Sequence, residues 1–348
     1  MAKIRSPFTQ LFNLSVPVVG CAMAGVAGPE LAAAVARAGG LGFLGSGTSS
    51  AERIQSEYQA AVKASGSKGV IGIGLLNFCI KPEVLESTIK CKPHSVWLAV
   101  GDFKPFIKPL RDAGIKVICQ VTTLHQITDV VREGADAVIV QGNESGGHGA
   151  SPASTLSFVP EAVDHVQQLC SSMGRPPVPI IAAGGISDAR QIAACFVLGA
   201  SGVALGTRLV ATNESSYSNA KKQLLVQTGS QASDQPATLR TTLYDELNEA
   251  VRWPAGITGR AICNDFTNQW DGQTPLQPEP LDQAKQSLKV DPSDLQVVGT
   301  WAGTSVGLIK SVEPAQSLVE RLMKDAGAIL KASGQLLEDD SLDLGICT

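Results

Sequence analysis

The stretch PIIAAGGISDARQIAACFVLGASGVALGT, residues 179–207, contains two apolar segments that each end in a turn of small residues. The two turns are Gly184-Gly185 and Gly206-Thr207. Apolar runs without alternation are typical of parallel strands that are covered by helices on both faces. The stretch between the turns has the pattern of a helix, so these residues predict one βα unit followed by the strand of the next.

The same pattern repeats from residue 17 onward, with a period of roughly 20 to 30 residues. Helices are expected between the strands, since most of the intervening stretches begin near Pro or a short polar residue and end at Gly. The helix after the sixth strand is expected over Pro160–Met173. Eight strands are predicted, over Pro17–Met23, Gly42–Gly45, Val70–Asn77, Ser95–Gly101, Lys116–Val121, Ala137–Gly142, Pro179–Gly185 and Gly202–Thr207. Eight such units close most economically into an α/β fold of the (β/α)8 TIM barrel type, and a doubly wound open sheet is the alternative.

The βα pattern ends after Thr207. Residues near 213–228 have a helical pattern, whereas 229–300 is rich in Thr, Gln, Asp, Pro and Gly. We therefore expect residues 1–228 to form the barrel and a helix within 301–332 to complete it. Residues 229–300 are expected to form a helical and loop insertion that caps the mouth of the barrel.

Composition excludes several classes of protein. The net charge is -4 and no Lys/Arg-rich run occurs, so nucleic acid is not an expected partner. The eight cysteines show no metal-ligand spacing, which favours reduced thiols and no metal site. No stretch approaches the roughly 18 apolar residues of a membrane span, and the expected location is the cytoplasm.

The two glycine turns are suited to a phosphate monoester. Glycine lets backbone N–H groups approach an anion closely, and the N-terminus of the following helix adds its dipole. The turns follow the seventh and eighth predicted strands, where TIM barrels most often bind phosphate. We therefore expect Gly184, Gly185, Gly206 and Thr207 to hold a phosphate group.

His148 is the leading catalytic candidate. It lies in QGNESGGHGA, residues 141–150, just beyond the carboxyl end of the sixth predicted strand, and active sites of barrels lie at that end. A histidine can take a proton from carbon or donate a hydrogen bond to a developing anion. The other three histidines, at 94, 125 and 165, are assigned structural or surface roles because they fall within helices or before a strand.

A third group of residues suits a flat ring such as isoalloxazine. The first predicted strand ends in small residues and Met23, in PVVGCAMAG at 17–25. Asn77 and Gln120, at the ends of the third and fifth strands, carry amides that can bind ring heteroatoms. All of these positions belong to the same rim of the predicted barrel.

These segments resemble the nitronate monooxygenase family, formerly called 2-nitropropane dioxygenases. The likeness extends over PVVGCAM, AGGLGFLGSG, QGNESGGHG, AAGGISDARQIAACFVLGASGVALGTR and AGTSVGLIKSVEPAQSLVERL. It implies FMN bound without a covalent link, with catalysis by His148 on a small nitronate such as propionate 3-nitronate, which O2 converts to a carbonyl compound and nitrite. The FMN-binding residues that the resemblance implies are Ala22, Met23, Ala24, Asn77, Gln120, Gly147, Gly184, Gly185, Gly206 and Thr207.

The chain departs from the family pattern at Cys21, where the family more often has Pro or Ala, and at Ser145, where it more often has Ala. It matches the family least in 229–300. Two alternatives remain open on this evidence: a flavin-dependent enoyl-[acyl-carrier-protein] reductase that consumes NAD(P)H, and an FMN protein that acts on another nitro or N-oxygenated compound. A homodimer is among the expected partners, and the sequence alone does not determine the oligomeric state.

Overall fold

The computed structural model describes residues 4–66, 69–228, 236–247, 251–273, 275–291 and 293–333. Its main sheet has eight parallel strands: β1 (Val18–Gly20), β2 (Gly42–Gly47), β3 (Ile71–Leu76), β4 (Ser95–Ala99), β5 (Lys116–Val121), β6 (Ala137–Gln141), β8 (Ile180–Ala183) and β9 (Gly202–Leu205). Their order is β1-β9-β8-β6-β5-β4-β3-β2. A parallel bridge between Val19 and Leu41 joins β1 to the residue before β2, so the sheet closes on itself. The predicted (β/α)8 TIM barrel is confirmed, and each predicted strand corresponds to one observed strand.

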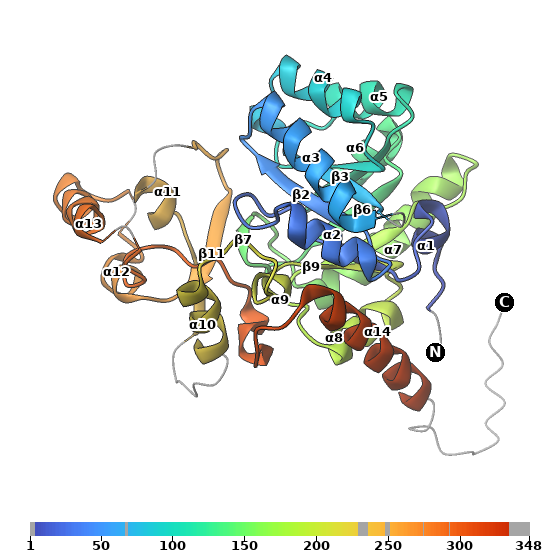
Figure 1. Ribbon diagram of the computed structural model, residues 1–348. Helices are drawn as coiled ribbons and strands as arrows, with labels where there is room; N and C mark the ends of the chain where they lie inside the picture. Colours follow the sequence, from blue (N-terminus) through green and yellow to red (C-terminus); the bar gives the residue numbers. More distant parts are fainter. Residues whose placement is uncertain are drawn as a thin grey trace.

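Helices surround the barrel, as Figure 1 shows. They are α2 (Pro29–Arg37), α3 (Ala51–Ser65), α4 (Pro82–Cys91), α5 (Lys104–Asp112), α6 (Leu124–Glu133), α7 (Thr155–Ser172), α8 (Ala189–Val197) and the short α9 (Thr207–Val210). The carboxyl-terminal helix α14 (Ala315–Ala332) packs against α8 and α2 and completes the outer layer. Within the described ranges, no helix has the length and apolar character needed to cross a membrane.

Helix α7 begins earlier than predicted. The sequence suggested a start at Pro160, but Ser154 caps the helix by accepting a hydrogen bond from the backbone N–H of Ser157. A capping serine satisfies an N–H group that the first turn otherwise leaves without a partner. Pro160 therefore lies inside the helix rather than at its first position.

The barrel interior is filled with apolar side chains and is closed at one end. Helix α1 (Pro7–Phe12) lies where the strands begin, and its Phe8 and Phe12 are fully buried together with Leu41 and Ile181. A larger apolar layer lies between the strands and the surrounding helices. Because α1 plugs the amino ends of the strands, a ligand can enter only from the carboxyl ends.

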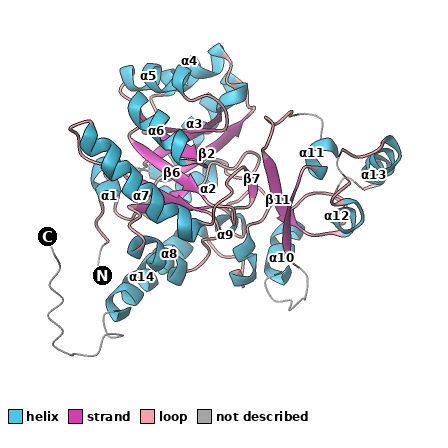
Figure 2. Cartoon of the chain, turned by 180° about the vertical axis from the view of Figure 1, so that it is seen from behind, coloured by secondary structure: helices cyan, strands magenta, loops and turns pink. Residues whose placement is uncertain are grey.

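A second lobe stands beside the carboxyl ends of the strands, as both views show (Figures 1 and 2). Its centre is an antiparallel sheet of β10 (Thr238–Thr241), β11 (Thr258–Ile262) and β7 (Gly147–Gly149), in which β11 is the middle strand. The lobe's helices are α10 (Asn219–Thr228), α11 (Leu243–Leu247), α12 (Asp265–Trp270) and α13 (Pro278–Val290). Elsewhere in the chain, short 3-10 helices follow β3, at η2 (Asn77–Cys79), and precede α14, at η3 (Thr304–Leu308).

The two strands β10 and β11 were not foreseen. Helices and loops were expected throughout 229–300, and both strands fall in that segment. They are short and carry polar residues at buried and half-buried positions, so they lack the apolar signal that marked the barrel strands. Residues 229–235, 248–250, 274 and 292 of the segment lie outside the described residues.

Candidate functional site

A cavity of about 290 Å³ opens at the carboxyl ends of the barrel strands, between the barrel and the lobe. The predicted site residues that line it are Ala22, Met23, Ala24, Gln120, Gly147, His148, Gly184, Gly185, Gly206 and Thr207. Asn77 is buried directly after Leu76, which also lines the cavity. The structure therefore brings the sequence-predicted residues to one place.

The segment after β1 is pressed closely against β2. A Cβ atom at Gly45 would lie 2.1 Å from the carbonyl oxygen of Met23, so only glycine allows this approach. The same carbonyl accepts hydrogen bonds from the N–H groups of Val26 and Ala27. Cys21 also lines the cavity, and burial raises the pKa of its thiol to about 12. This wall thus presents small side chains, a thioether and a neutral thiol.

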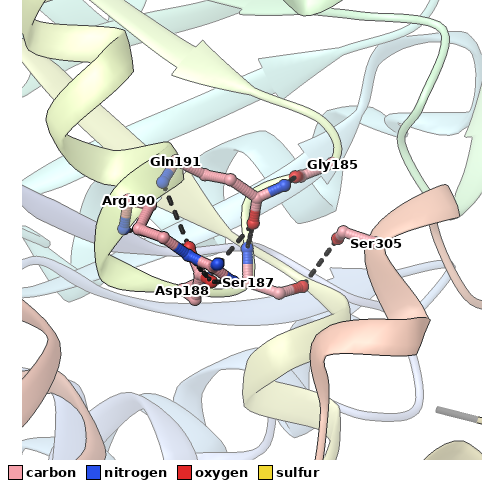
Figure 3. A network of polar contacts seen from close by, with 6 residues as sticks. All are labelled: Gly185, Ser187, Asp188, Arg190, Gln191 and Ser305. Atoms are coloured by element: carbon pink, nitrogen blue, oxygen red, sulfur yellow. Dashed lines mark hydrogen bonds and ion pairs between the residues drawn. The ribbon is translucent and has the colours of Figure 1, made fainter.

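Side-chain hydrogen bonds hold the glycine turn after β8, as Figure 3 shows for Gly185 and the residues that follow it. Gly184 and Gly185 have φ angles of 110° and 67°, which side chains with a Cβ rarely adopt. The Gln191 side chain donates to the Gly185 carbonyl and accepts from the N–H of Ser187 at 2.8 Å. The Ser187 hydroxyl lies 2.6 Å from that of Ser305, which ties the turn to the segment before α14.

The donors available to an anion at this end come from the turns themselves. Asp188 caps α8 and accepts from the N–H groups of Arg190 and Gln191, so the helix terminus is already occupied. Among the described residues, the backbone N–H groups of Gly184, Gly185 and Gly206 donate to no other group. The glycine N–H groups of the turns are therefore free to bind an anion, as expected, whereas the N–H groups at the start of α8 are not.

Three amide side chains around the cavity differ in how well they are satisfied. Gln120 accepts a hydrogen bond from the indole N–H of Trp97 at 3.1 Å. Gln141, at the end of β6, donates to the His148 carbonyl at 3.2 Å, but its own Oε1 is buried without a partner. Both polar atoms of the Asn77 side chain are also buried without a partner.

Buried polar atoms without a hydrogen-bond partner are uncommon in folded proteins, and a bound ligand is one reason for them. A flat ring that carries both N–H and C=O groups would satisfy the amides of Gln141 and Asn77, and the free N–H groups of the turns would satisfy a phosphate. The donor set thus fits a flat heteroaromatic ring that carries a phosphate group. Gln141 was missed in the sequence, although a polar residue at the end of the apolar run AVIVQ was a usable signal.

His148 is held by contacts from three sides. Its Nε2 lies 2.8 Å from Oδ1 of Asp245, and the two side chains are 13% and 18% exposed. The indole of Trp253 stacks on the imidazole with 3.7 Å between ring centroids and 12° between planes. The Trp301 ring lies tilted to the imidazole, with 4.8 Å between the ring centroids. A carboxylate oxygen accepts hydrogen bonds, so this contact pairs Oδ1 with a hydrogen on Nε2, and Nδ1 is the ring nitrogen that does not bond to Asp245.

The other histidines lie away from this cavity. His125 is 86% exposed beside Asp129, and His165 bonds to the Thr128 hydroxyl at 2.7 Å. His94 packs beside Phe12 at the opposite end of the barrel. In the part of the chain that the structure describes, no three His, Cys, Asp or Glu side chains gather to hold a metal ion.

The loop between β6 and β7, which presents His148, is clamped by charged side chains. The Glu144 carboxylate accepts from the backbone N–H of Thr155 at 2.9 Å and from its hydroxyl at 3.1 Å. Arg240 donates to Oδ1 of Asn143 at 2.9 Å and to the carbonyl of Ser145 at 3.1 Å. Burial, with the nearby Arg260, lowers the pKa of Arg240 to about 10, which still leaves it charged near neutral pH. These contacts fix the direction in which the loop points.

Comparison with known proteins agrees with this geometry. A family model described as Nitronate monooxygenase matches residues 5–100 and 86–325. The chain is 30% identical to "Nitronate monooxygenase npaC" of Metarhizium robertsii, over 94% of this chain and 98% of that one. Among solved structures, FabK from Thermotoga maritima superposes with a TM-score of 0.79 at 28% identity, covering 96% of this chain and 100% of that one. The nitroalkane oxidase from Streptomyces ansochromogenes superposes with a TM-score of 0.75 at 25% identity, over 95% and 99% of the two chains.

Proposed function

The chain belongs to the nitronate monooxygenase family of oxidoreductases, and we propose that it uses FMN to oxidise alkyl nitronates with O2 to a carbonyl compound and nitrite. The observation that carries this proposal is the paired His148, which lines a cavity containing unsatisfied amides and free backbone N–H groups. Such a cavity suits a flat cofactor with one phosphate, and the histidine suits an anionic substrate beside it.

In this proposal, the cofactor is held by the residues that the sequence singled out. The N–H groups of Gly184, Gly185 and Gly206 and the hydroxyl of Thr207 bind the phosphate, and the segment Ala22–Ala24 lies along the ring. Asn77, Gln120, Gln141 and Gly147 contact ring heteroatoms or edges. Bound FMN supplies one-electron oxidation of the nitronate and reactivity toward O2.

His148 binds and activates the substrate. When Nδ1 carries a proton, the imidazolium donates to a nitronate oxygen and neutralises its charge. When Nδ1 is free, it accepts a proton from the carbon next to the nitro group of a neutral nitroalkane. The carboxylate of Asp245 keeps the ring in one orientation in both states, and the indoles of Trp253 and Trp301 exclude water from it.

The lobe has the role of a cap in this proposal. Asp245 and Trp253 both belong to the segment 229–300, so the barrel supplies the cofactor site and the lobe completes the substrate side. In this division, residues 1–228 and the helix within 301–332 are assigned to the barrel, except that β7 and α10 lie in the lobe.

The test combines oxygen uptake with nitrite release. The purified yellow protein is mixed in air with the nitronates of nitroethane, 2-nitropropane and 3-nitropropionate, without NAD(P)H. Release of nitrite with consumption of oxygen supports the proposal. Absence of turnover with all three, together with rapid bleaching of the flavin by NAD(P)H, supports the enoyl-[acyl-carrier-protein] reductase instead.

A matched pair of variants tests the role of His148. His148→Asn is expected to retain FMN and to lose at least about 100-fold in kcat/KM, the usual loss when a general acid–base group is removed. His125→Asn, at an exposed histidine on α6, should behave as the unaltered protein. Full turnover by His148→Asn with FMN bound contradicts the assignment.

A further inference from the structure

Aromatic side chains of the lobe form the wall of the cavity next to His148. Trp253 stacks on the imidazole and also lies 5.3 Å from the ring of Phe78, measured between centroids. Trp301 lines the same side, and its backbone N–H donates to the Tyr217 hydroxyl at 3.2 Å. Burial raises the pKa of Tyr217 to about 12, so this phenol stays neutral. The surface that the remainder of a substrate meets is therefore apolar and uncharged.

No Lys or Arg among the described residues faces this cavity. Among the described residues that line it, none is Lys, Arg, Asp or Glu. The cations behind the wall are engaged elsewhere: the Lys221 ammonium donates to the Gly299 carbonyl at 3.0 Å, and Arg240 and Arg260 donate to Asn143. One acidic group behind the wall is Asp245, which bonds to His148.

These observations bear on substrates with a second negative charge. One anionic group, the nitronate, can pair with a protonated His148. A carboxylate at the other end of the molecule would lose its hydration against indole rings, without a counter-charge among the described residues that line the cavity. An apolar group in the same place would instead gain from burial against those rings.

We propose that this site takes nitronates whose remaining part is apolar, branched or aromatic, and that it discriminates against carboxylate-bearing nitronates such as propionate 3-nitronate. This inference rests on the proposed function and narrows its substrate class. Trp253 and Trp301 are the residues that determine the specificity.

The experiment compares two substrates of nearly the same shape. In the nitronate of 1-nitro-3-methylbutane, two methyl groups replace the two carboxylate oxygens of propionate 3-nitronate. The expected ratio of kcat/KM is on the order of 100 in favour of the apolar substrate, because a buried carboxylate is left unpaired. A ratio near one, or a preference for propionate 3-nitronate, overturns the inference.

A binding measurement separates this inference from the proposed function. Calorimetric titration of the holoenzyme with neutral 1-nitro-3-methylbutane and with 3-nitropropionate requires no turnover. At least about tenfold tighter binding of the apolar compound supports the inference even if neither nitronate is oxidised, in which case only the proposed function fails. Equal or tighter binding of 3-nitropropionate contradicts it.

Four variants complete the test. Trp253→Ala admits water and should reduce the substrate ratio at least about fivefold, whereas Trp253→Phe should retain it. Trp270→Phe, which alters an indole on α12 away from the cavity, is the matched control. Arg252 precedes Trp253 in the chain and does not line the cavity. If Arg252→Ala selectively removes activity on propionate 3-nitronate, a cation serves that substrate and the inference is wrong.

Discussion

Replacement of Asp245 by Asn tests whether the carboxylate positions His148, the proposed catalytic histidine. The change keeps the size of the side chain but replaces a charged acceptor 2.8 Å from Nε2 of His148 with a neutral amide. A hydrogen bond to a charged group contributes about 1.5 to 3 kcal/mol, and the two side chains are only 13% and 18% exposed, so solvent screening is limited. At about 1.4 kcal/mol per tenfold change in rate, we expect kcat/KM to fall roughly 10- to 150-fold.

The assay is nitrite release across a range of pH, with the flavin content measured for each preparation. A positioning role predicts that Asp245→Asn displaces the pH profile of kcat/KM, which a purely structural defect would not do, and that Asp245→Glu restores part of the rate. The matched control is Asp129→Asn, at a second His–Asp pair whose side chains are 86% and 58% exposed. An Asp245→Asn enzyme with kcat/KM within twofold of the parent and an unchanged profile refutes the reasoning.

Three further predictions concern the cofactor turn and the stability of the barrel. Gly185→Ala should weaken FMN binding at least about tenfold, measured by fluorescence titration, because a positive φ costs about 1–2 kcal/mol in other residues and the new Cβ would lie 2.9 Å from that of Glu144. Burial, with nearby Lys116, lowers the pKa of His94 to about 4, so the folded state favours the neutral ring. The neutral ring therefore contributes to the free energy of unfolding above pH 6.5, and this contribution is lost as the pH falls toward 4. His94→Gln should flatten this part of the curve of denaturation midpoint against pH. Glu313→Gln leaves the 4% exposed Arg208 without its carboxylate partner and should lower the free energy of unfolding by about 3 kcal/mol in urea titrations.

The barrel was predictable because its signal is local. Strands such as AVIVQ and IIAA are buried on both faces, so each appears in the sequence as a short apolar run without reference to its neighbours. The cofactor end was predictable for a similar reason, since Gly184 and Gly185 must adopt positive φ angles and therefore appear as glycines. Position alone then selected His148, because it follows a strand at the carboxyl end of the barrel.

The partners of His148 could not be predicted in this way, because they depend on the register between distant strands. Asp245 lies 97 residues away, and neither its spacing nor its neighbours mark it. In the lobe sheet, His148 pairs with Gly259, and a Cβ atom at Gly259 would lie 2.3 Å from the Trp301 ring. Trp301 can thus lie beside His148 only because glycine stands opposite the histidine. A shift of one residue would place the long side chain of Arg260 there and reverse the faces of the strand, so the chemistry of the substrate side is set by tertiary pairing and not by any local motif.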